Sequence, residues 1–447
     1  MTTPHPTAPP APRHIVVVGA GIAGLVCAQR LQRAGARVTV LDRATPGGRA
    51  LTQEQHGFSI NLGPHALYRG GHAFRVLRSL GIAPDGTVAT GGDGERLGRR
   101  SPLPDGLGTW LHTELLPGSS RYLMAPAVRA ILFPPPGTLA DAIASFSAPL
   151  RELTEALVRV STYSADPTRM DAKVAFDQVK LAITGGVLYL HGGWQSLVTP
   201  LQAGLTIQRQ AVTAVRPGRV STADGEIEAD DVVLAVPPAT ERSLTGQDPG
   251  ETAEAAVATL CLGLSRLPVP EVPFVLGVDR PLYLSVHSGW ARLAPVGGAL
   301  VHVARYLREG EQGHAEELET WLDGHQPGWR DLVVFRRYLP RIRVAGHPAP
   351  GKARPGIVVA PGLWRCGDSV GDQGLLADAA FASGDAVADG ILAQRQPPRA
   401  SPNRPSRPRP GRSYPHFYDF YPYFRGCRAR ACAPDLSKGS RFPSSEV

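Results

Sequence analysis

The sequence predicts an α/β fold whose first unit combines parallel strands with a helix, and the N-terminal region supports this in three ways. A short β-branched run over residues 14–18 predicts a buried strand. Glycines at the spacing G-x-G-x-x-G follow this run and lead into a helical segment. A second apolar strand then ends in an acidic residue. This order of elements is typical of a Rossmann-type βαβ unit that binds a dinucleotide.

Each glycine has a predicted task in this unit. Gly19 permits the tight turn after the strand, Gly21 lets a pyrophosphate approach the backbone, and Gly24 lets the helix lie close to the strand. The helix predicted over residues 25–34 directs its N-terminus at the anion, where unpaired N–H groups and the helix dipole favour phosphate. The predicted phosphate-binding loop consists of Gly19, Ala20, Gly21, Ile22, Ala23 and Gly24.

The end of the second strand carries the predicted ribose contact. Gly35 ends the helix, residues 38–41 form the strand, and Asp42 follows 18 residues beyond Gly24. A carboxylate at this place accepts hydrogen bonds from an unphosphorylated ribose, and Arg43 beside it is included in the predicted site. A glycine-rich turn of another α/β protein is the alternative, but such a turn does not require all these features in register.

Two more glycine-containing segments follow, at residues 46–50 and 57–68. The first reads Pro-Gly-Gly-Arg-Ala, and the guanidinium of Arg49 suits phosphate oxygens because it presents a planar fork of donors. An ordinary surface arginine is the alternative. These segments resemble the flavin-dependent superfamily of amine oxidases, protoporphyrinogen oxidases and phytoene desaturases, and the likeness is closest to the phytoene-desaturase-like branch.

The resemblance implies FAD as the cofactor and assigns roles to these residues. Gly48 and Arg49 are expected against the cofactor's phosphates. The residues expected near the flavin ring are Gly63, Pro64 and His65. His65 is also the candidate catalytic residue, since desaturation removes a hydride from one carbon and a proton from its neighbour. A structural histidine that orders its loop is the alternative for His65.

Segments in the middle of the chain continue the resemblance. Residues 189–201, 207–215 and 230–238 resemble the return of the chain to its cofactor domain. In this family a valine backbone meets the adenine there, and the matching position is Val212.

Segments near the C-terminus resemble the closing FAD motif. They are the run Trp-Arg-Cys-Gly-Asp-Ser-Val-Gly and a helix predicted over residues 374–384. The resemblance implies that Asp368, with Gly367 before it, binds the ribityl chain. It also implies that the N–H groups of Leu376 and Ala377 face the flavin carbonyl that becomes negative on reduction. Capping of a helix is the alternative role for Asp368.

The placement of these motifs predicts a cofactor domain assembled from separate parts of the chain. The FAD-binding domain takes residues 13–90, 186–248 and 350–395, and an inserted α+β substrate domain takes residues 91–185 and 249–349. Disordered segments are predicted at residues 1–12 and 396–447. The elements predicted for the substrate domain are a loop over residues 91–108, helices over 139–160, 170–183 and 314–322, and strands over 256–264, 282–286 and 299–306.

The positive charge of the chain is concentrated at its C-terminus. The net charge is +8, and residues 396–447 carry ten Lys or Arg against three Asp or Glu, so +7 belongs to this tail and +1 to the body. The body is therefore not expected to bind nucleic acid. The tail is interpreted either as a tether to an acidic partner, nucleic acid or an anionic membrane, or as a non-functional extension.

Cysteine usage and hydropathy indicate the cellular compartment of the protein. Cys27, Cys261 and Cys366 are scattered, and Cys427 and Cys432 lack the companion pair of a zinc site, so we expect no metal and a reduced, cytoplasmic setting. No secretory signal and no run of 18 apolar residues is present, which leaves peripheral membrane contact as an option. Arginine supplies 43 of the 47 basic residues, which indicates a GC-rich bacterial genome.

The predicted activity is desaturation of an apolar small molecule, such as an isoprenoid or another secondary metabolite, by hydride transfer to the flavin. A flavin amine oxidase acting on an amine or amino-acid derivative is the first alternative, although none of the four lysines matches the lysine typical of that branch. A flavoprotein with a structural cofactor, isomerase-like or a binding scaffold, is the second alternative.

No second dinucleotide fingerprint occurs, so oxygen, a quinone or another carrier is the expected electron acceptor. The candidate residues of the substrate cavity, each with ordinary packing as its alternative, are Tyr189, His191, Tyr283, His287 and Tyr306.

Overall fold

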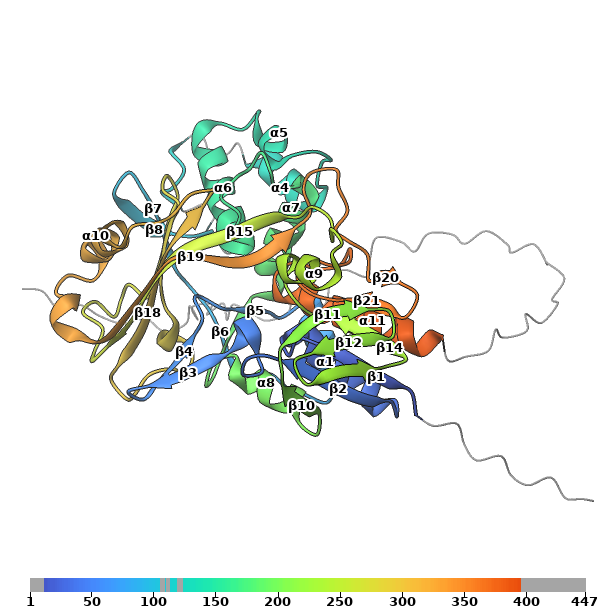
Figure 1. Ribbon diagram of the computed structural model, residues 1–447. Helices are drawn as coiled ribbons and strands as arrows, with labels where there is room; N and C mark the ends of the chain where they lie inside the picture. The colour runs from blue at the N-terminus through green and yellow to red at the C-terminus, as the bar shows by residue number, and fades with distance from the viewer. Residues whose placement is uncertain (1–11, 105–108, 110–112, 119–123, 395–447) are drawn as a thin grey trace, which may run out of the picture. The chain divides into compact units, whose positions relative to one another are not determined.

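The computed structural model of the chain describes residues 12–104, 109, 113–118 and 124–394 (Figure 1). The predicted basic tail lies outside the described residues, and so does all of the predicted N-terminal segment except its last residue. Cys427 and Cys432 lie outside them as well. The described cysteines, Cys27, Cys261 and Cys366, are buried free thiols.

The first βαβ unit forms where the glycine pattern predicts it. Strand β1 (His14–Val18) is followed by helix α1 (Ile22–Arg33) and strand β2 (Arg37–Asp42), and the two strands pair in parallel. The helix begins three residues earlier than predicted, because Gly21 is its N-cap and Gly24 lies in its first turn.

Six strands from distant parts of the chain form the first sheet, in the order β10-β2-β1-β14-β21-β20. Strands β10 (Thr206–Arg209), β14 (Asp231–Leu234) and β21 (Leu363–Arg365) each pair in parallel with their neighbour, whereas β20 (Val358–Ala360) is antiparallel to β21. Figure 1 shows these blue, green and orange segments in one layer. The predicted α/β fold with a discontinuous Rossmann-type sheet is therefore confirmed, while the boundaries of the predicted domains stay a prediction.

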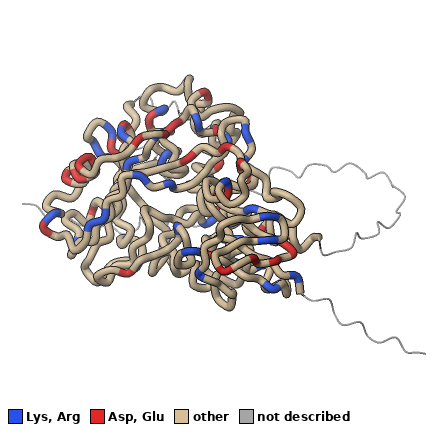
Figure 2. Tube along the Cα trace, in the orientation of Figure 1, with Lys and Arg blue, Asp and Glu red and all other residues tan. Residues whose placement is uncertain are grey.

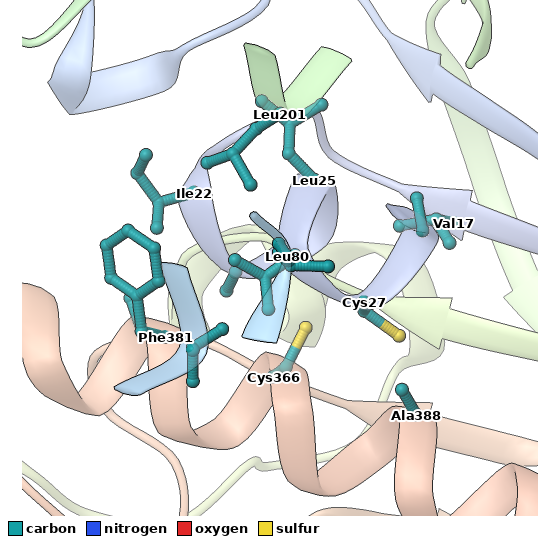
Figure 3. Close-up of a cluster of buried hydrophobic side chains, with 14 of the residues drawn as sticks. Val17, Ile22, Leu25, Cys27, Leu80, Leu201, Cys366, Phe381 and Ala388 are labelled. Carbon is teal, nitrogen blue, oxygen red and sulfur yellow. The ribbon is translucent and has the colours of Figure 1, made fainter. Parts of the chain in front are cut away.

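Helices α1 and α11 (Ala377–Ala393) pack against each other beside this sheet. Figure 3 shows Leu25 and Cys27 of α1 in one buried cluster with Phe381 and Ala388 of α11. Because these side chains are almost completely removed from water, the cluster is a major source of stability for the N-terminal unit.

The helix predicted over residues 374–384 is wrong at both ends. It begins at Ala377 and continues through Gly384 to Ala393. A Cβ at Gly384 would lie 2.4 Å from the carbonyl oxygen of Ala23. The glycine therefore allows α11 to approach α1 closely and does not end the helix.

A second sheet contains seven strands in the order β19-β15-β18-β17-β16-β7-β8. Strands β15 (Ala253–Leu264), β17 (Leu282–Val286) and β18 (Ala299–Leu307) confirm the predicted strands, with small extensions at the ends of β15 and β18. The loop predicted over residues 91–108 is wrong in its first part, because β7 and β8 pair there as an antiparallel hairpin. The bounds of the other members are β7 (Asp93–Arg96), β8 (Arg99–Pro102), β16 (Phe274–Gly277) and β19 (Val333–His347).

Helices form most of residues 125–185 and a further segment after β18. The predicted ranges 170–183 and 314–322 are confirmed by α7 (Ala172–Gly185) and α10 (Ala315–His325), with shifts of one to three residues at their ends. The single helix predicted over residues 139–160 is wrong, since the backbone is extended at Ser147 and a proline starts a new helix there. The bounds of the helices before α7 are α4 (Ala125–Leu132), α5 (Leu139–Ile143) and α6 (Ala148–Thr162).

The remaining elements connect the two sheets or form small ribbons beside them. They are β3 (Thr52–Gln55), β4 (Phe58–Asn61), β5 (Leu67–Tyr68), α2 (His72–Ser79), β6 (Gly86–Val88), β9 (Val187–Leu190), α8 (Gln195–Gln202), β11 (Val212–Arg216), β12 (Arg219–Thr222), β13 (Gly225–Glu228) and α9 (Pro238–Thr245). Basic and acidic residues are interspersed along the traced body in Figure 2. Within the described part of the chain, no helix combines the length and the apolar character needed to cross a membrane.

Candidate cofactor and substrate site

The glycines of the predicted phosphate-binding loop differ in their surroundings. A Cβ at Gly19 would lie 2.3 Å from the Ala235 carbonyl oxygen, and one at Gly24 would lie 2.0 Å from the Gly19 carbonyl oxygen. Backbone atoms thus fill both places. A Cβ at Gly21 would meet nothing within 4 Å. The backbone of Gly21 therefore faces open space, which is what the close approach of a phosphate requires.

The N-terminus of α1 is open to an anion. Its N-cap is Gly21, no side chain caps it, and its first turn contains no acidic residue. Gly48 lies directly across, because a Cβ on it would be 3.4 Å from the Cα of Gly21. In addition, Gly47 N donates to the Ala20 carbonyl oxygen at 2.8 Å. The structure thus brings the predicted phosphate-binding loop and the Gly48 segment together at the N-terminus of α1. The N–H groups there have no side-chain cap, which fits a bound pyrophosphate.

Asp42 ends β2 and holds this loop. One of its carboxylate oxygens accepts a hydrogen bond from Ala20 N at 2.7 Å, and Arg43 is exposed next to it. The chain leaving β10 reaches the same strand end, where Gln210 N donates to the Asp42 carbonyl oxygen at 2.9 Å. Val212 begins β11 two residues later. The residues predicted for the ribose and the adenine therefore lie in neighbouring segments.

Arg49 and Asp368, which are predicted to contact different parts of the cofactor, bind each other. Both Nη atoms of Arg49 reach the carboxylate of Asp368, which also accepts from Arg343 Nη2 at 3.0 Å and from Gly346 N at 2.7 Å. Burial alone would raise the pKa of Asp368, but the two guanidinium groups outweigh burial and the pKa is lowered. Asp368 is an ionised carboxylate with several donors, and the N-cap of α11 is a different residue, Leu376.

Gly367 ties the closing motif to α11. Gly367 N donates to Ser383 Oγ at 2.9 Å. A Cβ on Gly367 would meet nothing within 4 Å, so its backbone is also open to a ligand. Gly367 and Asp368 line a pocket together with Val236 and Arg365.

Strand β19, which the sequence prediction missed, runs along the whole site. One end of the strand supplies Arg343 and Gly346 to Asp368. The other end supplies Arg337, whose Nη2 donates to the Asn61 carbonyl oxygen at 2.9 Å, just before the predicted flavin-ring turn. The strand therefore belongs both to the second sheet and to the cofactor site.

A buried arginine holds the loop between Asp368 and α11. Arg354 is 8% exposed. Its guanidinium donates to four carbonyl oxygens, those of Gly371 (2.7 Å), Gly374 (2.9 Å), Asp368 (3.1 Å) and Gln373 (3.1 Å). Leu376 at the end of this loop has a φ of 56°, in the region that favours glycine. Arg354 thus holds the loop that leads to the strained backbone of Leu376 and to Ala377, the residues that are predicted to face the flavin.

The predicted flavin-ring turn follows β4. Gly63 has a φ of 83°, and a Cβ there would lie 2.8 Å from Ile342 Cδ1. His65 Nδ1 lies 3.0 Å from the Gly63 carbonyl oxygen, and the ring packs edge-on against Trp194 at 5.3 Å. Burial lowers the pKa of His65 and so favours the neutral imidazole. His65 orders its own turn in the structure, and its catalytic role stays a prediction.

Tyrosine and histidine rings form one cluster next to this turn. Tyr163 Oη lies 3.4 Å from the Pro64 carbonyl oxygen, and its ring centre is 5.8 Å from that of Tyr306. Contacts continue from Tyr306 through Tyr283 to His287, whose Nε2 is 3.3 Å from Tyr283 Oη. The ring cluster consists of Tyr163, Tyr189, Tyr283, His287, His302 and Tyr306.

The structure brings four of the five cavity candidates into the ring cluster. His191 lies outside it and accepts a hydrogen bond from Arg292 N at 3.1 Å. Tyr163 and His302 are members that the sequence prediction missed. His302 lies in an almost continuously buried strand, and Tyr163 has a φ of 63° just after α6, so neither occupies a patterned position.

Known proteins match parts of this sequence. Residues 17–80 match the family of NAD(P)-binding Rossmann-like domains. A 133-residue stretch is 36% identical to coproporphyrinogen III oxidase from Propionibacterium freudenreichii and covers 26% of this chain and 25% of that protein. Shorter stretches are 56% identical to phytoene dehydrogenase from Streptomyces griseus and 49% identical to L-amino-acid oxidase from Bungarus fasciatus, each covering 12% of this chain and 11% of the relative. The chain thus spans a quarter or less of the length of these curated relatives.

Solved structures share the fold over most of the chain. An oxidoreductase from Methanosarcina mazei aligns with a TM-score of 0.68 at 18% identity, covering 84% of this chain and 100% of that one. Reduced UDP-galactopyranose mutase aligns with a TM-score of 0.65 at 16% identity, covering 86% and 94%. Putrescine oxidase, in a triple mutant, aligns with a TM-score of 0.64 at 14% identity, covering 86% and 99%.

These matches agree with the geometry of the described residues. The sequence matches cover the glycine-rich region or other limited stretches, and the structural matches cover both sheets. Residues 17–80 therefore match a Rossmann-like domain family, and the predicted resemblance of the chain to the phytoene-desaturase and amine-oxidase proteins is confirmed.

Proposed function

We propose that this chain is an FAD-dependent oxidoreductase that desaturates an uncharged, apolar small molecule such as an isoprenoid. One observation carries the choice of substrate class: the ring cluster beside the flavin-ring turn is buried and uncharged. Oxygen, a quinone or another carrier takes the electrons in this proposal. The protein acts in the cytoplasm or at a membrane surface.

The residues of the first sheet fit FAD. The open N-terminus of α1 and Gly48 would bind the pyrophosphate, and Asp42 would bind the adenosine ribose. The resemblance and the open backbone at Gly367 support a ribityl chain beside Asp368. When bound, FAD supplies the ring that accepts a hydride.

The side chains of the site then have two tasks. Arg49 would release one of its contacts with Asp368 and turn its fork of donors to a phosphate, while Arg343 and Gly346 keep Asp368 in place. The first N–H groups of α11 would donate to the ring carbonyl that gains negative charge, because they stand at the positive end of a helix.

The electrostatics of the ring cluster disfavour an amine. Burial lowers the pKa of His302 to about 3 and lowers that of His287 well below its usual range, so both rings are neutral at pH 7. An ammonium substrate would have to give up its hydration in this buried, uncharged cluster, which is costly. The cluster therefore favours a substrate like that of the phytoene-dehydrogenase relative over one like that of the amino-acid oxidase.

Anaerobic mixing tests the proposal. Purified yellow protein is mixed with a panel of uncharged isoprenoids and, separately, with a panel of primary amines, and flavin absorbance is followed. We expect bleaching by at least one isoprenoid and a product lighter by two hydrogens. Bleaching by amines alone, with release of ammonia, would support the amine-oxidase alternative, and bleaching by no compound would reject a redox role.

A further inference from the structure

Among the residues that the structure describes, the ring cluster contains buried polar atoms without a protein partner. We infer that His287 and His302 bind one uncharged oxygen, a hydroxyl or carbonyl, on an otherwise apolar substrate. This inference rests on the proposed function, because it assigns the substrate of that function to the ring cluster.

The partnerless atoms are His287 Nδ1, His302 Nδ1 and Tyr306 Oη. The three residues are at most 1% exposed. Buried side-chain polar atoms in folded proteins almost always have a hydrogen-bond partner, because a buried polar atom without one is costly. The Nδ1 atoms of His287 and His302 belong to rings that contact each other, and together they indicate a ligand that supplies the missing partners. Tyr306 stands four residues beyond His302 on β18, which separates their Cα atoms by about 13 Å, so its hydroxyl is not part of this site.

The rest of each histidine ring is already engaged. His287 Nε2 lies 3.3 Å from Tyr283 Oη, and His302 Nε2 lies 3.9 Å from Cys261 Sγ. The two imidazoles also stack on each other with 4.3 Å between their centres. Because these contacts fix the orientation of both rings, their Nδ1 atoms are the ones left for a ligand.

The neutral state of the two imidazoles determines which ligands suit the site. A neutral imidazole offers one donor and one acceptor, and a hydroxyl can complement either. The flanking arginines do not offer an anion a direct site, since Arg159 donates to the carbonyl oxygens of Gly277 and Val278, and Arg337 donates to that of Asn61. Burial also disfavours an ammonium group, because a charge without a partner is costly to desolvate. The site therefore suits an uncharged oxygen.

Three C15 probes with the same isoprenoid chain test this inference. They are farnesene, farnesol and farnesylamine, which end in a hydrocarbon, a hydroxyl and an ammonium group. Binding to the flavin-loaded protein is followed by tryptophan fluorescence, because Trp290 stacks on Tyr189 at 5.3 Å. We expect farnesol to bind at least about tenfold more tightly than either of the other probes, the effect of one to two net hydrogen bonds.

Variants identify the groups responsible. His302→Leu is expected to reduce the preference for farnesol over farnesene to less than about threefold. Tyr306→Phe removes a partnerless hydroxyl outside the site, keeps the packing of the ring and is expected to keep the full preference. His325→Leu is the matched control, because His325 is also buried with a partnerless Nδ1 but lies on α10 beside Glu95. This control is expected to keep the full preference.

Other outcomes overturn the inference. Equal binding of farnesol and farnesene, absence of farnesol binding, or an unchanged preference in His302→Leu would each reject the oxygen site. If the same protein is bleached by a hydrocarbon isoprenoid, these results reject the oxygen site alone. Protein that is colourless and takes up no FAD would instead reject the proposed function.

Discussion

Gly21 and Gly24 lie three residues apart but have opposite surroundings. Open space surrounds Gly21, while the carbonyl oxygen of Gly19 would lie 2.0 Å from a Cβ at Gly24. Gly21→Val is therefore expected to fold and to lose flavin, because its side chain would occupy the space in front of α1. Gly24→Val is expected to be strongly destabilised by the overlap.

Two measurements separate these effects. Flavin content is read from the absorbance of the purified protein, and stability from urea unfolding. A yellow Gly21→Val protein would contradict the phosphate site, and a stable Gly24→Val protein would contradict the close contact between α1 and the loop.

His302 gives the free energy of unfolding a predictable pH dependence. Burial lowers its pKa to about 3 in the folded protein, against 6.5 when unfolded. The unfolded chain therefore binds a proton first as the pH falls, so stability is fully present above about pH 6.5 and is lost below it. Between pH 7 and pH 5 the loss amounts to about 2 kcal/mol.

His302→Leu should lack this part of the pH dependence. Its free energy of unfolding, measured by urea titration at pH 7, 6 and 5, should gain about 2 kcal/mol relative to the unsubstituted protein as the pH falls. A constant difference across these pH values would show that His302 has the same pKa in the folded and the unfolded protein.

Among the helices and strands, those with a clear local sequence pattern could be predicted. The β1-α1-β2 unit and β17 combine apolar runs with glycine signals or clear boundaries, and they form close to the predicted positions. Strand β19 places arginines between apolar residues and contains Pro340, a pattern that argues against a strand. The strand is stabilised by pairing with β15 and by two ion pairs, Arg336 with Glu319 and Arg341 with Glu254. All of these partners are distant in sequence.

The loop before α11 depends on Arg354. Arg354→Met removes four hydrogen bonds to carbonyl oxygens, and we expect a loss of about 2–4 kcal/mol in stability and at least about tenfold weaker FAD binding. Arg159→Met is the matched control, because Arg159 also donates to several carbonyl oxygens, but those of the second sheet.

FAD titration of apoprotein and urea unfolding measure the two quantities. Arg159→Met should lose stability to a similar degree and keep its affinity for FAD. Equal weakening of FAD binding in both variants would mean that Arg354 acts through general stability and not through the loop.

At the scale of the whole molecule, one carboxylate joins the two sheets. Asp368 follows β21 of the first sheet, while Arg343 and Gly346 belong to β19 of the second. Asp368→Asn leaves two arginines without their carboxylate, and we expect a loss of about 3 kcal/mol in the free energy of unfolding. Asp389→Asn is the control, since its ion pair with Arg30 is exposed and should contribute less than about 1 kcal/mol. Equal losses in urea unfolding would contradict the coupling of the sheets through Asp368.

The long-range part of the site could not be read from sequence. The glycine loops, Asp42 and Asp368 belong to recognisable motifs. The structure places them at the edge of the first sheet where strands β1, β2 and β21 end. The ring cluster takes Tyr163 from the residue after α6, Tyr189 from β9 and His302 from β18, and no local pattern links these residues. The sequence therefore indicated most tyrosines of the ring cluster as cavity candidates. It contained no signal for His302 and Tyr163, which complete the cluster.

The reach of β19 has a thermodynamic consequence. The strand contacts the Asp368 loop through Gly346 and the backbone before the His65 turn through Arg337, so we expect occupancy of the two predicted binding regions to be linked. Linkage between equilibrium affinities is reciprocal. A bound isoprenoid should strengthen binding of the prosthetic group by the same factor by which that group strengthens isoprenoid binding.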